Sequence, residues 1–132
     1  MLSDKLVGLS PASVFGYFEK ICSIPHGSGN TKLISDYLVS FAKEHDIRYI
    51  QDDLNNILMF GEATTGYEDH EPVILQGHMD MVCDKRPDVV HDFTKDPIRP
   101  FVDGEWLKAK GTTLGADDGI GVAAIMAVLE AK

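Results

Sequence analysis

The chain has 132 residues, of which 44% are hydrophobic, and this is enough apolar material for the core of one domain. Its 12 basic and 21 acidic residues give a formal charge of -9, which argues against nonspecific binding to nucleic acid or to an anionic membrane, since both require a cationic face. No apolar run approaches the roughly 20 residues of a membrane helix, and the first ten residues show no secretory pattern, so we expect a cytoplasmic location.

The first predicted element is an amphipathic helix. Ser10 and Pro11 are typical of a helix start, with a capping residue followed by proline at the first helical position. Apolar residues then recur at helical spacing, which predicts that one face packs inward. These residues are Val14, Phe15, Phe18, Ile21 and Cys22.

A second amphipathic helix follows a loop at residues 24–30, which contains glycine and proline. Asn30 or Thr31 can cap this helix, and the apolar pattern ends near His45. Its expected buried stripe consists of Leu33, Ile34, Tyr37, Leu38, Phe41 and Ala42.

Two hairpins are predicted from pairs of short apolar runs. Residues 47–51 and 56–60 read as strands on either side of a polar turn. Residues 98–102 and 105–110 flank Asp103 and Gly104, a pair that favours a type I′ turn. We expect surface loop at residues 61–70 and irregular chain at residues 83–97.

The last predicted element is a helix that starts near Gly119, with an apolar side formed by Val122, Ala123, Ile125, Met126 and Leu129. Together the elements predict an α/β fold in which helices pack on a mixed β-sheet. A helix in such a fold normally returns the chain to another strand, so we expect residues 1–132 to be the N-terminal part of a larger catalytic domain. Cys22 and Cys83 resemble no paired-cysteine motif and are expected to be free thiols.

The most informative motif is GHMDMV, at residues 77–82. The short apolar run 72–75 before it reads as a buried strand whose carboxyl end delivers His78 and Asp80. Imidazole and carboxylate are ligands that suit zinc and related divalent metals. Asp80 is near enough along the chain to accept the second N–H of the His78 ring, as metal-bound histidines require. His26, His45 and His70 lack this context and are read as ordinary surface or hydrogen-bonded residues.

A second motif is GTTLGADDGIG, at residues 111–121, which places Asp117 and Asp118 at a glycine-rich junction before the last helix. One of these aspartates can also serve as the N-cap of that helix. A phosphate loop is disfavoured because the spacing is wrong and two acids would repel phosphate. A catalytic zinc needs three protein ligands, and no pair of adjacent glutamates occurs here. Either the site is completed by chain beyond this sequence, or the metal interpretation is wrong.

Four segments together resemble the aminoacyl-histidine dipeptidases, a bacterial carnosine-cleaving branch of the co-catalytic zinc peptidases. The segments are SIPHGSGNT at 23–31, GHMDMV at 77–82, HDFTKDPI at 91–98 and DGEWLKAKGTTLGADDGIGVA at 103–123. The resemblance implies a three-layer α/β/α catalytic domain and two Zn²⁺ ions in the complete site, with Mn²⁺ or Co²⁺ as possible substitutes. It also implies a small peptide substrate, a homodimeric full-length enzyme, and no nucleic-acid or membrane partner.

The resemblance also assigns roles to individual residues. His78 is then a ligand of one metal, Asp117 the carboxylate that bridges both metals, and Asp80 the catalytic-site residue that orients His78. A glutamate general base and the remaining ligands would lie downstream. The wider family has a cis peptide after the bridging aspartate, which here falls between Asp117 and Asp118. This branch usually carries asparagine where the chain has Asp118, whereas its relatives carry aspartate.

The sequence thus predicts part of a zinc-dependent dipeptidase that cleaves Xaa-His dipeptides, with the 132-residue chain itself inactive. One alternative is a related tripeptidase or aminoacylase. Another is a binding or regulatory module without catalysis.

Overall fold

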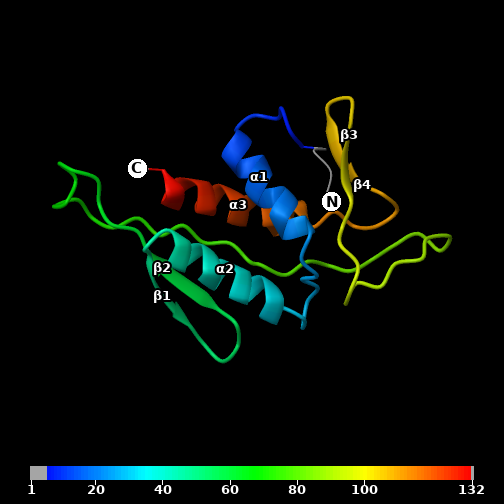
Figure 1. Ribbon diagram of the computed structural model, residues 1–132, viewed down its shortest axis with the longest axis horizontal. Coiled ribbons are helices and arrows are strands. Elements are labelled where there is room, and N and C mark those ends of the chain that lie inside the picture. Colours follow the sequence, from blue (N-terminus) through cyan, green and yellow to red (C-terminus); the bar gives the residue numbers. More distant parts are fainter. Residues whose placement is uncertain (1–5, 132) are drawn as a thin grey trace.

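The computed structural model describes residues 6–131, which form three helices and two β-hairpins (Figure 1). The predicted α/β composition is confirmed, and within the described residues the strands form two separate two-stranded antiparallel sheets. The assignment of residues 1–132 to part of a three-layer catalytic domain stays a prediction. Residues 1–5 and 132 of the predicted domain lie outside the described residues. The elements are α1 (Ala12–Cys22), α2 (Lys32–Glu44), β1 (Arg48–Gln51), β2 (Ile57–Phe60), β3 (Pro100–Asp103), β4 (Trp106–Ala109) and α3 (Ala116–Glu130).

The core lies where α1 packs along α3, with α2 beside them (Figure 1). Phe18 is fully buried and approaches Gly119 closely, because a Cβ atom on Gly119 would lie 3.2 Å from its ring. Cys22 is buried and Cys83 is exposed, and both are free thiols as predicted. The largest fully buried side chains are those of Phe18, Phe41, Ile21, Ile34, Met126, Cys22 and Ser35.

The helix starts differ in detail from the predictions. Pro11 is the N-cap of α1, with extended backbone, and no side chain caps the helix, so the expected Ser10 cap is wrong. Thr31 is the N-cap of α2, as predicted, but it also makes no side-chain cap bond. This helix ends at Glu44 with His45 as its C-cap, close to the expected end. Leu33 is about half exposed and falls outside the buried stripe, because at helical spacing it points away from the buried residues of α2.

Both predicted hairpins are confirmed. In the first, Arg48 pairs with Phe60, and the Asp52 carboxylate stabilises the turn by accepting backbone N–H groups. In the second, Asp103 pairs with Trp106, so the turn residues are Gly104 and Glu105. A positive φ occurs at Gly104 only, which is the pattern of a type II′ turn, so the expected type I′ turn at Asp103 and Gly104 is wrong.

The predicted buried strand at 72–75 is wrong. Val73 and Ile74 are 82% and 88% exposed, and the segment is extended chain without strand pairing. The apolar, β-branched composition favours a strand, but a strand exists only when a neighbouring backbone completes its hydrogen bonds. No strand within the described residues pairs with this segment. None of the helices in residues 6–131 combines the length and apolar content that a membrane span requires.

The contact between α1 and α3 leads to a stability prediction. Phe18→Ala should lower the free energy of unfolding by about 3–5 kcal/mol, since it empties a fully buried ring site against Gly119. Leu54→Ala is the matched control, because Leu54 is 79% exposed and its truncation should change the free energy by less than about 0.5 kcal/mol. Urea unfolding of both variants measures the difference, and equal effects would contradict the described core.

Candidate metal centre

The motif at residues 77–82 is held in place by the loop that follows α1. The Met81 amide donates to the His26 carbonyl at 3.0 Å, and the Ser28 amide donates to the Met81 carbonyl at 3.1 Å. These bonds form an isolated parallel bridge between Gly27 and Met81. His78 and Asp80 are therefore positioned by this bridge rather than by the strand that the sequence predicted.

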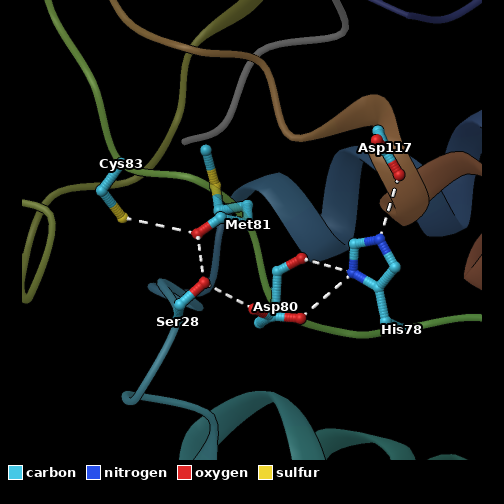
Figure 2. Close-up of polar contacts among 6 residues, drawn as sticks. All are labelled: Ser28, His78, Asp80, Met81, Cys83 and Asp117. Atoms are coloured by element: carbon cyan, nitrogen blue, oxygen red, sulfur yellow. Dashed lines mark hydrogen bonds and ion pairs between the residues drawn. The ribbon is translucent and has the colours of Figure 1, made fainter.

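Asp80 contacts the imidazole of His78, as its spacing predicted (Figure 2). The His78 Nδ1 atom lies 3.1 Å from Asp80 Oδ1 and 3.0 Å from the Asp80 carbonyl oxygen. The second carboxylate oxygen, Oδ2, accepts a hydrogen bond from the Ser28 hydroxyl at 2.5 Å. This hydroxyl is the main reason that the pKa of Asp80 is lowered, with the neighbouring His78 adding to the effect. The carboxylate is therefore ionised and fixed at both oxygens.

Asp117 faces the other nitrogen of the same ring. Its Oδ1 atom lies 3.0 Å from His78 Nε2, while the rest of its side chain is almost fully exposed. The hydrogen bond to Asp117 is the largest cause of a raised pKa at His78, and Asp80 raises the pKa further. With a carboxylate at each nitrogen, the metal-free ring is stabilised in its doubly protonated form.

The first turn of α3 contains Asp117 and Asp118, and neither side chain caps the helix. Gly115, with φ of 76°, is the N-cap, and no side chain makes a cap bond, so the capping interpretation of Asp117 or Asp118 is wrong. Both aspartates have non-helical backbone angles, and the peptide bond between them is cis, as the family resemblance predicted. The Asp118 carboxylate lies against Gly77 and Gly121, where any β-carbon would overlap it.

The donor pair of His78 and Asp117 fits a divalent metal in part. Two ligands of one Zn²⁺, each about 2.0–2.2 Å from the ion, lie no more than about 4 Å apart. The 3.0 Å between Nε2 and Oδ1 satisfies this limit, and both atoms are open to solvent. Within residues 6–131, however, no group of three or more histidine, cysteine, aspartate or glutamate side chains is arranged to hold a metal ion. The described residues therefore supply two adjacent donors and no complete site.

The three histidines that were read as surface or hydrogen-bonded residues, His26, His45 and His70, do not join the pair of His78 and Asp117. His45 Nδ1 bonds to the Phe41 carbonyl oxygen, and His70 stacks on Tyr67. His26 is buried, with its Nδ1 on the Ile24 carbonyl oxygen at 2.6 Å, and burial lowers its pKa.

Ser28 was not among the predicted site residues. It is a small polar residue between two glycines, which is typical of any loop, and it lies 52 residues from Asp80 in the sequence. No spacing rule connects residues so far apart. The only available signal was the segment SIPHGSGNT, which contains Ser28 and contributed to the family resemblance as a whole.

Comparisons with known proteins identify two similar dipeptidases. The chain is 53% identical over 126 residues, 96% of its length, to the cytosol non-specific dipeptidase of Escherichia coli (strain K12). It matches the crystal structure of aminoacylhistidine dipeptidase from Vibrio alginolyticus over 96% of its length, with 48% identity and a TM-score of 0.93. No family model matches the chain. The resemblance to the aminoacyl-histidine dipeptidases is thereby confirmed over the length compared, and the chain spans 26% of the length of each relative.

The contacts of His78 with Asp80 and Asp117 lead to a prediction about the pKa of its imidazole. In metal-free protein the pKa of His78 should lie above the ordinary value for histidine, and Asp117→Asn should lower it, because the largest favourable partner of the charged ring is lost. The ion pair exists below the pKa of His78 and is lost as pH rises through that value. Side-chain NMR titration measures this, with His26 as the internal control whose pKa lies below the ordinary value. An unchanged His78 pKa in the variant would contradict the described contact.

Proposed function

We propose that this chain supplies part of the active site of a metal-dependent dipeptidase. The observation that carries the proposal is the pair of carboxylates around the His78 ring. Asp80 contacts Nδ1 of the ring, and Asp117 faces Nε2. Support also comes from the two relatives, both of which are named as dipeptidases. Because the chain covers only 26% of each relative, the activity belongs to a longer protein in this proposal.

In this proposal His78 Nε2 and the Asp117 carboxylate would hold Zn²⁺, with Mn²⁺ or Co²⁺ as substitutes, and Asp117 would be the carboxylate shared by two ions. A bound metal of this kind polarises a scissile carbonyl and lowers the pKa of a water molecule. The residues of this chain perform the supporting tasks. Asp80 accepts a hydrogen bond from the Nδ1–H of His78, which would keep the proton on Nδ1 and leave Nε2, beside Asp117, free to bind a metal. The open position of Asp117 leaves room for further ligands.

The finer proposal is hydrolysis of Xaa-His dipeptides such as carnosine by a cytoplasmic, homodimeric protein. One relative is named for aminoacyl-histidine substrates and the other as non-specific, so dipeptide hydrolysis is the coarser and better supported statement. A tripeptidase or aminoacylase of the same superfamily is the alternative enzyme. A binding module without catalysis is the alternative from another class, and the incomplete donor set in residues 6–131 is the observation that favours it.

Activity of the complete protein tests the proposal. It should hydrolyse carnosine in a Zn²⁺-dependent manner, and His78→Ala should lower both Zn²⁺ affinity and kcat/KM by more than about 100-fold, because a ligand is lost. His70→Ala is the matched control, since His70 is exposed and packs only on Tyr67. Cleavage of dipeptides without histidine at the same rate would favour the non-specific activity. Tight Zn²⁺ binding that survives His78→Ala would contradict the site.

The 132-residue chain alone should not hydrolyse dipeptides. Two donors hold a metal weakly, whereas a catalytic zinc normally has three protein ligands. An assay with carnosine and added Zn²⁺ or Mn²⁺ measures this directly. Turnover by the pure chain would show that the described residues already contain a complete site.

A further inference from the structure

Ser28 contacts the carboxylate that holds His78 (Figure 2). Its hydroxyl donates to Asp80 Oδ2 at 2.5 Å, while Asp80 Oδ1 faces His78 Nδ1 at 3.1 Å. The two oxygens of one carboxylate are therefore held by two different partners. Because Ser28 lies in the loop between α1 and α2, this contact joins that loop to the histidine.

The backbone around Ser28 is held by amide hydrogen bonds, and the hydroxyl, whose single proton goes to Asp80 Oδ2 at 2.5 Å, lies farther from the Met81 carbonyl oxygen, at 3.3 Å. The Ser28 amide donates to the Met81 carbonyl, and the Met81 amide donates to the His26 carbonyl. Gly27 packs so closely on Cys83 that a Cβ atom on it would lie 2.5 Å from the sulfur. We therefore expect the loop to keep its backbone position when the Ser28 hydroxyl is removed. An effect of that removal on His78 then reports on positioning and not on the structure of the loop.

The Asp80 carboxylate needs a second partner to keep one orientation. Rotation about the last side-chain bond of an aspartate is broad and roughly two-fold, and more than a third of this side chain is exposed. One contact to His78 Nδ1 leaves rotation open, since either carboxylate oxygen, the Asp80 carbonyl oxygen and the solvent compete for the same N–H. The Ser28 hydroxyl on Oδ2 selects the orientation that presents Oδ1 to the ring.

The order of the three side chains argues against Ser28 as a nucleophile. In serine hydrolases the histidine stands between serine and aspartate, so that the ring takes the hydroxyl proton. Here Asp80 stands between Ser28 and His78, and the far nitrogen of the ring faces Asp117. The hydroxyl donates to a carboxylate that also contacts the ring, so the imidazole that acts as the base in serine hydrolases does not face the hydroxyl.

We propose that Ser28 is a positioning residue of the metal centre. It locks the Asp80 carboxylate, which fixes the His78 ring in the direction that presents Nε2 beside Asp117. The effect on metal affinity rests on the proposed function, whereas the effect on the orientation of His78 does not.

The test compares Ser28→Ala with Ser28→Thr in the complete protein. Calorimetry of the metal-free protein with Zn²⁺ should show that Ser28→Ala lowers the affinity about 10-fold. This is the lower end of the range for the loss of a residue that hydrogen-bonds around a metal ligand. Ser28→Thr keeps the hydroxyl at an exposed position and should stay within about 3-fold of the wild type. Ser40→Ala is the matched control, because this exposed hydroxyl bonds only to a carbonyl within α2.

NMR of the His78 ring nitrogens provides the readout that does not depend on metal. Ser28→Ala should shift these signals in metal-free protein, and it should cause no further shift when Asp80→Ala is already present. Unchanged signals in Ser28→Ala, or equal losses of affinity in the alanine and threonine variants, would overturn the proposal. If the wild type bound no Zn²⁺, the proposed function would fail, while the NMR comparison would still decide the role of Ser28.

Discussion

The backbone pairing of Met81 with the loop after α1 is the constraint on which the site depends. Its amide and carbonyl bond to His26 and Ser28, while its buried side chain packs against Gly115, where a Cβ atom would lie 3.0 Å from the sulfur. One residue thus joins the loop, the motif that carries His78, and the start of α3. The predicted metal donors come from the last two of these segments.

In the proposed site, a proton and a metal ion would compete for the same nitrogen of His78, Nε2, which faces the Asp117 carboxylate. The contact of Nε2 with Asp117 is an ion pair at the surface, and such pairs contribute little to stability because solvent screens them. A divalent cation carries more charge than a proton and can replace it, with release of the proton on binding. The formal charge of -9 adds to the attraction for cations.

Local sequence patterns predicted most of the helices and hairpins, but not which segments pair with one another or which residues cap the helices. The helices and hairpins followed from apolar periodicity and turn residues, which act over a few residues. The run 72–75 has the composition of a strand and remains unpaired, because composition does not supply a partner. The capping interpretation failed because the N-cap position falls on Gly115, two residues before Asp117, and no side chain makes a cap bond there.

The sequence by itself determined the donor types and the contact between His78 and Asp80, since residues two apart on an extended chain remain neighbours. It also placed Asp117 at the start of the last helix. Only the tertiary structure decided that Asp117 meets His78 across 39 residues, and that Ser28 meets Asp80 across 52. Those distances are set by the packing of α1 on α3 and by the pairing at Met81, which depend on the whole core rather than on any local pattern.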